Sequence, residues 1–253
     1  GRGQLAPSHV QGWQTISASN LPFYPQDHAP HAMTVADIQQ LIADFAASAK
    51  RAVDAGFDLI ELHAAHGYLL HQFMSPLSNQ RTDEYGGSFA NRIRLTLEVF
   101  QAMKNVVPEG FPIGVRLSAT DWMDDVASWD VESSIGLSKA LEQLGAVYIH
   151  VSSGGLHVEQ KLDIHAGFQV PFAEAIKKAV NIPVIAVGLI TEAMQAEGIL
   201  QYEQADAIGI ARAILYDPRW PWHAAAELGE TVCITPQYLR CQPHGLSGLF
   251  QAF

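Results

Sequence analysis

Five short apolar runs, separated by stretches of helical pattern, most constrain what this 253-residue chain can fold into. The runs occupy residues 57–63, 111–118, 146–152, 182–187 and 205–211. They are almost continuously apolar rather than alternating, which is typical of parallel strands buried on both faces. The sequence therefore predicts an α/β fold built on a parallel sheet.

The segments between these runs predict helices. Thr34 is expected to cap the first helix, with Asp37 completing a pattern that resembles a capping box, and Gly56 is expected to end it. Further helices are expected over residues 91–106, 131–144, 170–180, 191–202 and about 218–228. We expect residues 1–253 to form a single domain. Within it, residues 1–33 would be a long active-site loop and residues 231–253 a C-terminal tail.

Polar or glycine residues stand at or near the C-terminal end of each run: His63 and His66, Arg116, Ser152-Ser153-Gly154, Gly188, and Arg212. Five strands that present functional groups at one end favour a (β/α)₈ barrel over a doubly wound sheet. A barrel needs eight strands, so the remaining strand–helix units would have to precede Gly1.

The composition argues against several classes of protein. The formal net charge is -11 and no basic run occurs, which argues against a nucleic-acid partner. No apolar run approaches the length of a membrane span, and the first ten residues lack a signal-peptide core. Cys233 and Cys241 are expected to be free thiols of a cytoplasmic protein, because a metal pair would need closer spacing and further ligands.

Gly188 and Arg212 each follow a predicted strand and open a helical segment. Phosphate binds well to backbone N–H groups at helix N-termini, and in barrels the last two strands are its usual place. Singly, such residues are more often a turn former or a surface ion pair. As a pair they favour a phosphate site.

Arg116 lies inside an apolar strand, where exposure to solvent is not expected. Its charge needs an anion or a polarised acceptor. A ligand would provide one, and a buried ion pair with Asp121 or Glu61 would provide another. Composition leaves both interpretations open.

His63, His66 and Tyr68 lie within six residues at the end of the first run. They would suit hydrogen bonding to a carbonyl or nitro oxygen, with Tyr68 as a proton donor. The histidines could instead bind a metal with His71 or Glu61 as a third ligand, or be purely structural. H-A-A-H lacks the central Glu of the zinc protease motif, so we predict no metal.

The stretch HAAHGYLLHQFMSPLSNQRTDEYGGSFANR resembles the signature of the Old Yellow Enzyme family. VRLSATD, VSSGG, AVGLI, ARAILYDPRWPWHAA and PQYLR follow in the family's order, so the resemblance runs from Gly1 to about Arg240. The two-histidine form and the PQYLR ending resemble the thermophilic-like branch, which includes the xenobiotic reductases. The resemblance implies an FMN-dependent ene-reductase on a (β/α)₈ barrel. NADPH or NADH would be the reductant, and alkenes conjugated to carbonyl or nitro groups the substrates.

The resemblance also implies roles for residues. His63 and His66 would bind the substrate oxygen, and Tyr68 would protonate the α-carbon after hydride arrives at the β-carbon. Arg116 would lie beside N1 and O2 of the flavin and stabilise its reduced ring.

The resemblance also assigns further residues to the flavin phosphate site and to the substrate pocket. Gly188, Ala211 and Arg212 would bind the flavin phosphate; Ala211 replaces the usual Gly and would serve if its φ is negative. Arg2 would end a cofactor-binding segment, and Trp222 or Trp220 would shape the substrate pocket. Arg240 resembles an arginine that reaches across a dimer interface in some relatives.

The same resemblance implies that the first three βα units of the barrel are absent from this sequence. We therefore expect an N-terminal segment of the barrel as a separate or nicked chain, and a homo-oligomer. The alternatives are a flavin-free partner subunit and a metal-dependent hydrolase barrel.

Overall fold

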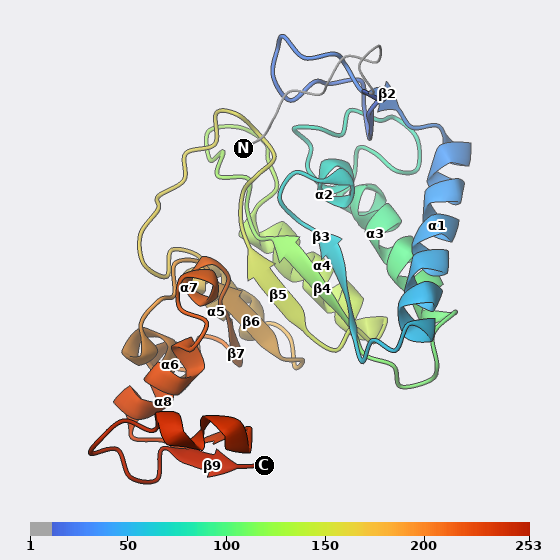
Figure 1. Ribbon diagram of the computed structural model, residues 1–253. Helices are drawn as coiled ribbons and strands as arrows, with labels where there is room; N and C mark the ends of the chain where they lie inside the picture. The colour runs from blue at the N-terminus through green and yellow to red at the C-terminus, as the bar shows by residue number, and fades with distance from the viewer. Residues whose placement is uncertain (1–11) are drawn as a thin grey trace.

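The computed structural model describes residues 12–253 (Figure 1), so Arg2 lies outside the described residues. Its centre is a sheet of five parallel strands in the order β3-β4-β5-β6-β7. The strands are β3 (Ile60–Ala64), β4 (Ile113–Ser118), β5 (Ile149–Ser152), β6 (Val184–Val187) and β7 (Ala207–Gly209). Because every pair is parallel, the carboxyl ends of all five strands lie at the same end of the sheet.

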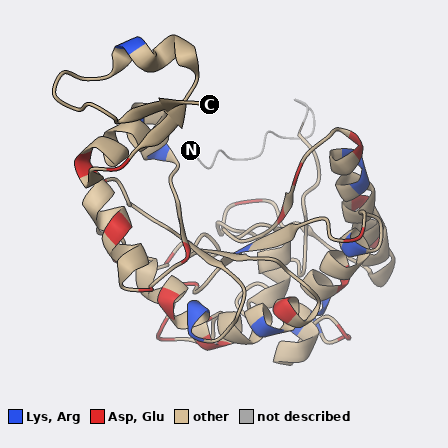
Figure 2. Ribbon diagram, turned by 90° about the horizontal axis from the view of Figure 1, so that it is seen from below, with Lys and Arg blue, Asp and Glu red and all other residues tan. Residues whose placement is uncertain are grey.

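Helices separate successive strands and lie along the outside of the sheet (Figure 1). They are α1 (Val35–Asp54), α2 (Leu69–Met74), α3 (Phe89–Lys104), α4 (Val131–Gln143), α5 (Val170–Lys177), α6 (Ala193–Gln201), α7 (Arg212–Tyr216) and α8 (Trp220–Leu228). Seen from below, the ribbon curves as an open arc, and many of the charged residues lie on the outer helices (Figure 2). No helix within residues 12–253 is long and apolar enough to cross a membrane.

The two faces of the sheet differ in burial. Leu62, Val115 and Val151 are at most 1% exposed and belong to the hydrophobic core. Alternate residues point the other way because side chains alternate along a strand. On that inner face, His63 pairs in register with Arg116 and Arg116 with His150, and all three are only half-buried. The inner face therefore holds the polar residues of the sheet.

Gly114 in β4 shows how tightly the inner face is packed. A Cβ atom there would lie 2.1 Å from Cζ of Tyr148, so the ring occupies the space that a side chain would need. Burial and Glu61 raise the pKa of Tyr148 to about 12, so its phenol stays protonated beside that carboxylate. The glycine lets an aromatic ring lie across the neighbouring strand.

Several predicted boundaries are confirmed and others need correction. Thr34 caps α1 in a true capping box with Asp37. β3 was expected over residues 57–63 but begins at Ile60, because the chain first turns at Gly56 (φ +86°) and leaves Phe57 65% exposed. The six-residue helix α2 was not predicted, since it is too short to show a period.

The N-terminal loop and the C-terminal tail both contain regular structure that the sequence did not predict. Strands β1 (Ile16–Ser17) and β2 (His31–Ala32) pair in the loop. In the tail, β8 (Val232–Ile234) pairs with β9 (Phe250–Ala252), and the 3₁₀ helix η2 (Pro236–Cys241) lies between them in sequence. Two- and three-residue strands carry no readable alternation.

Candidate active site

His63, His66 and Tyr68 gather where β3 ends. His63 lies within β3, His66 in the following turn, and Tyr68 at the N-cap of α2. The ring centroids of His63 and His66 are 5.1 Å apart, and those of His63 and Tyr68 are 5.5 Å apart. The Tyr68 side chain is accessible, with 64% of the residue's surface exposed. The structure therefore brings the three predicted residues together.

The turn that carries these groups has an uncommon backbone. His66 has φ +60° and Gly67 has φ +75°, both in the left-handed region. The loop after β5 lies directly against it: a Cβ added to Gly155 would be 2.5 Å from Cα of His66. Only glycine at position 155 allows this approach, so the VSSGG motif has a packing reason beside the histidines.

Both histidines lie in surroundings that disfavour a positive charge. Burial, and then the Arg116 guanidinium, lower the pKa of His66 to about 4. The same two causes lower the pKa of His63. Both imidazoles are therefore neutral near pH 7, and each ring carries one N–H donor. Nε2 of His66 lies 2.7 Å from Oγ of Ser152.

Among the described residues, Arg116 forms no ion pair with either carboxylate considered from the sequence, each of which contacts a histidine. Asp121 Oδ1 lies 2.9 Å from Nε2 of His71, and Glu61 Oε2 lies 2.9 Å from Nδ1 of His150. Among the described residues, Nε of Arg116 is buried and has no hydrogen-bond partner. A buried guanidinium N–H without a partner marks a place where an acceptor belongs.

A cavity of about 260 Å³ lies at the carboxyl ends of β4–β7, and Arg116, Gly188, Ala211 and Arg212 all line it. Gly188 has φ +126°, a conformation that L side chains rarely adopt, and Arg212 begins α7. Ala211 has φ −115°, so it meets the condition under which alanine can replace glycine. The four predicted cofactor residues that the structure describes therefore share one cavity.

Gln169 is a lining residue that the sequence reasoning missed. Its Nε2 donates to the Val187 carbonyl at 2.8 Å, and its Oε1 accepts from the Ser153 hydroxyl at 2.6 Å. A Cβ on Gly188 would lie 2.6 Å from this Nε2. Gln169 thus ties the end of β5 to the end of β6. Nothing in the local pattern distinguishes it, because its partners are 16 and 18 residues away.

Trp222 and Arg240 do not lie at this cavity. Trp222 packs in a second cluster with Phe250, at a centroid distance of 5.0 Å, and Arg219 stacks over its ring at 4.2 Å. Arg240 is exposed in η2. Trp220 is nearer, since its Nε1 donates to the Thr191 carbonyl, and Thr191 lines the cavity.

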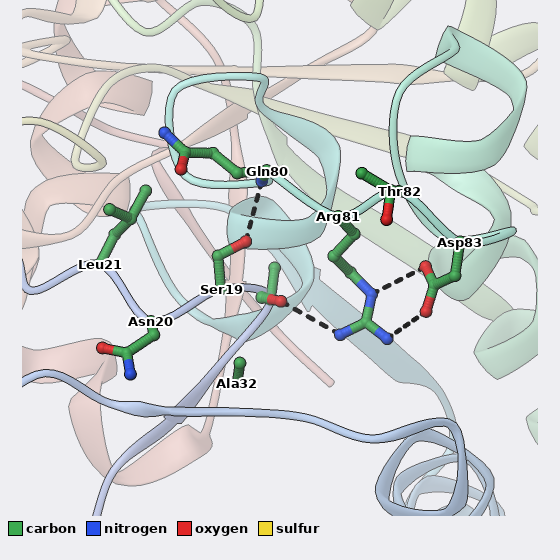
Figure 3. A pocket seen from close by; sticks show the side chains of 9 residues that line it. Ser19, Asn20, Leu21, Ala32, Gln80, Arg81, Thr82 and Asp83 are labelled. Carbon is green, nitrogen blue, oxygen red and sulfur yellow. Dashed lines mark hydrogen bonds and ion pairs between the residues drawn. The ribbon is translucent and has the colours of Figure 1, made fainter.

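A more open hollow of about 370 Å³ lies between the N-terminal loop and the loop after α2 (Figure 3). Arg81 lines it, but the guanidinium is engaged by Asp83 and by the Ala18 and Met33 carbonyls. Ser19 Oγ accepts from the Gln80 N–H at 2.8 Å. These contacts join two loops, so we place the candidate site at the other cavity, where a charged group lacks a partner.

The described residues offer no assembled metal site. Within residues 12–253, no group of three His, Cys, Asp or Glu side chains is placed to hold a metal ion. His71 and Glu61, the third ligands considered from the sequence, instead contact Asp121 and His150, each at an N···O distance of 2.9 Å.

The residues present fit a flavin phosphate and ring. The cavity has glycine- and helix-end backbone for a phosphate, and an unpartnered guanidinium N–H beside it. Together with the parallel strand–helix fold, this arrangement is typical of α/β proteins that bind a phosphate-bearing cofactor at the carboxyl ends of their strands.

Comparison with known proteins identifies the family. Residues 7–230 match the model of the "NADH:flavin oxidoreductase / NADH oxidase family". The chain is 45% identical over 233 residues to a NADPH dehydrogenase of Geobacillus sp. (strain WCH70), covering 92% of this chain and 67% of the relative. It is 47% identical over 220 residues to an NADH:flavin oxidoreductase of Gibberella zeae, covering 82% and 53%.

Comparison with solved structures points to the same family. The old yellow enzyme homologue from Zymomonas mobilis superposes with a TM-score of 0.73 at 26% identity, covering 95% of this chain and 71% of that chain. Morphinone reductase in complex with tetrahydroNAD gives a TM-score of 0.70 at 25% identity, covering 95% and 64%.

The chain therefore belongs to the NADH:flavin oxidoreductase / NADH oxidase family, that of the old yellow enzymes. Its class is NAD(P)H-dependent flavin oxidoreductase with FMN as cofactor, and its fold is part of a (β/α)₈ barrel. The chain spans between about half and two thirds of the length of these two curated relatives.

Proposed function

We propose that the protein containing this chain reduces alkenes conjugated to a carbonyl or nitro group, using NADPH or NADH through FMN in a ping-pong cycle. The observation that carries the proposal is the gathering of His63, His66 and Tyr68 at the end of β3. On the adjacent strand lies Arg116, which lines the cavity at the ends of β4–β7.

FMN would be held at that cavity. Gly188, Ala211 and Arg212 would bind its phosphate through backbone N–H groups and the guanidinium. Arg116 would place its unpartnered Nε–H toward the ring. When bound, FMN supplies the hydride that the alkene receives, after taking one from the nicotinamide.

The remaining chemistry belongs to the side chains. The neutral rings of His63 and His66 can each donate one N–H to the substrate oxygen, which withdraws electron density from the conjugated alkene. The exposed phenol of Tyr68 can reach a bound molecule and give its proton to the α-carbon. His66 would exchange its present partner, Ser152 Oγ, for the substrate.

Further strand–helix units would complete the barrel, in the same polypeptide or as a separate or nicked chain. The described sheet leaves one edge of β3 and one edge of β7 unpaired. Exposed apolar side chains stand close in sequence to both edge strands: Leu59, just before β3, is 49% exposed, and Leu215 and Tyr216 in α7, the helix after β7, are 81% and 93% exposed. Unpaired edges beside apolar surface are avoided in stable proteins.

Oligomer and location are also part of the proposal. The exposed Arg240 would suit a homo-oligomer contact near a neighbouring site. Cys233 and Cys241 are free and exposed, which suits a cytoplasmic location.

A visible spectrum tests the proposal. The protein purified with FMN should be yellow, should bleach with NADPH without oxygen, and should regain its colour when 2-cyclohexenone or maleimide is added. A colourless protein that takes up no FMN would support the flavin-free subunit. A stoichiometric metal without the flavin band would support the hydrolase.

A further inference from the structure

The turn after β3 needs support from outside itself. His66 has φ +60° and is not a glycine, so its left-handed backbone is disfavoured unless neighbouring groups hold it. Gly67 follows with φ +75°. This short segment sets where the His66 ring and the Tyr68 phenol lie, since both leave the chain within one residue of Gly67.

Each polar backbone group of Gly67 is bound by a side chain from α2. The Gly67 N–H donates to Nδ1 of His71 at 3.0 Å. The Gly67 carbonyl accepts from Nε2 of Gln72 at 2.7 Å. From β4, the Ser118 hydroxyl accepts the His66 N–H at 2.9 Å. The turn is therefore held by these side chains in addition to its one backbone bond, in which the Tyr68 N–H donates to the Ala65 carbonyl at 3.1 Å.

His71 is the buried centre of this arrangement. Its side chain is 0% exposed, and because Nδ1 accepts from Gly67, the proton of the neutral ring belongs on Nε2. Nε2 lies 2.9 Å from Oδ1 of Asp121, which is also 0% exposed. The other oxygen, Oδ2, accepts from the Ser75 hydroxyl at 2.6 Å and the Trp129 N–H at 2.8 Å.

We propose that His71, oriented by Asp121, is the positioning residue that holds the His66–Gly67 turn in its left-handed form. Neither residue lines the cavity at the ends of β4–β7, so they act through the turn. The Asp121 carboxylate, 2.9 Å from Nε2 of His71, favours a proton on that nitrogen by its charge, which leaves Nδ1 to accept from the Gly67 N–H. The inference rests on the proposed function for the roles of His66 and Tyr68.

Two substitutions test the roles of the two ring nitrogens of His71 separately. In His71→Asn the amide oxygen lies near the position of Nδ1 and can still accept from Gly67, while the donor to Asp121 is lost. In His71→Gln the amide nitrogen lies near the position of Nε2 and can still donate to Asp121, while the acceptor for Gly67 is lost. Each loses one buried contact, so each controls for the stability of the other.

Stopped-flow kinetics of the FMN-loaded protein measures the effect. His71→Gln should slow reoxidation by 2-cyclohexenone about 10- to 100-fold, because small misplacements of reacting groups carry costs of that order. His71→Asn should stay within about threefold of the unchanged protein, on the same scale of misplacement. Ser138→Ala, which removes a buried hydroxyl that donates to the Ser134 carbonyl on α4, should have no effect. Equal losses in the Asn, Gln and Ser138→Ala variants would overturn the proposal.

Hydrogen exchange and histidine NMR provide a readout without turnover. The Gly67 amide should exchange slowly in the unchanged protein and in His71→Asn, and faster in His71→Gln. The ¹⁵N signals of His66 should move only in His71→Gln. A protein that reduces no alkene but shows this pattern would refute the proposed function and uphold the positioning role. A Gly67 amide that stays protected in His71→Gln would refute the positioning role.

Discussion

At the residue scale, the candidate site depends on side chains whose protonation is set by burial. His66 and His63 remain neutral near pH 7 because both are partly buried beside Arg116. Tyr68 differs from them, since it is exposed and open to a bound molecule. Two neutral imidazoles and an accessible phenol therefore lie on one short segment.

Removing the phenol should separate the two halves of the proposed cycle. In Tyr68→Phe we expect flavin reduction by NADPH to be preserved and reoxidation by an alkene to fall about 10²- to 10⁴-fold, the usual contribution of a positioned acid. Stopped-flow absorbance measures both steps. Tyr202→Phe, at a residue that is 82% exposed at the end of α6, is the control. Unchanged reoxidation in Tyr68→Phe would exclude it as the proton donor.

His66 should make stability depend on pH. Its pKa falls from 6.5 to about 4 on folding, so between these values the unfolded chain binds more protons than the native protein. The free energy of unfolding should therefore decrease as pH falls through this window. Urea unfolding at pH 7 and pH 5 measures it, and His66→Asn, which tolerates a left-handed backbone, should flatten the dependence. An equally steep dependence in His66→Asn would assign it to other groups.

Gly188 allows a matched test at the cavity. Gly188→Ala should cost about 1–3 kcal/mol in unfolding free energy and weaken FMN binding, because its φ is +126° and a Cβ would meet Gln169. Gly198→Ala lies within α6 with no atom near the new Cβ, and should stabilise by about 0.5–1 kcal/mol. Urea unfolding and FMN titration measure both. Normal FMN binding by a Gly188→Ala protein would contradict the phosphate assignment.

At the element scale, the apolar runs and caps predicted the five strands and the main helices. Thr34 and Asp37 form the expected capping box, and Gly56 ends α1 as expected, because these contacts are local. The boundaries that failed depend on distant packing. β3 begins three residues later than predicted, where Ile60 first pairs with Ile113 on β4. The small strands of the tail form only because residues near 232 and 250 meet.

Because the Tyr148 ring lies across β4, we predict a strong requirement for glycine at position 114. Gly114→Ala should cost about 1–3 kcal/mol by overpacking, since the new Cβ would overlap the Tyr148 ring. A double-mutant cycle with Tyr148→Ala checks this by urea unfolding, because the cost should fall sharply when the ring is absent. The same cost in both backgrounds would show that the ring is not the cause.

At the scale of the whole molecule, the open arc is the main feature. The sheet has five strands where a closed barrel of this family has eight, and exposed apolar side chains occur just before β3 and in α7, which follows β7. The cavity lies at the carboxyl ends of β4–β7, so units that closed the barrel would lie at the same sheet and could complete the proposed cofactor site.

Hydrogen exchange should report whether the edges are covered. In these 253 residues alone, amides at the outer edges of β3 and β7 should exchange much faster than those of β5, which pairs on both sides. If the proposed further strand–helix units are present with it, edge and centre should become similarly protected. Fast exchange at both edges with those units present would contradict closure of the barrel.

The sequence by itself determined the family and the parallel sheet, because the motif residues and the strand–helix pattern are local features, and it supplied the candidate site residues. It left open whether Arg116 pairs with Asp121 or Glu61, and it did not show that His71 turns toward Asp121. Only the tertiary structure showed that both carboxylates lie against histidines instead. Asp121 is 50 residues from His71, and Gln169 is 16 residues from Ser153, so their contacts depend on how the loops after separate strands pack together. The placement of Trp222 in a separate cluster was decided in the same way, by packing of the tail against α8.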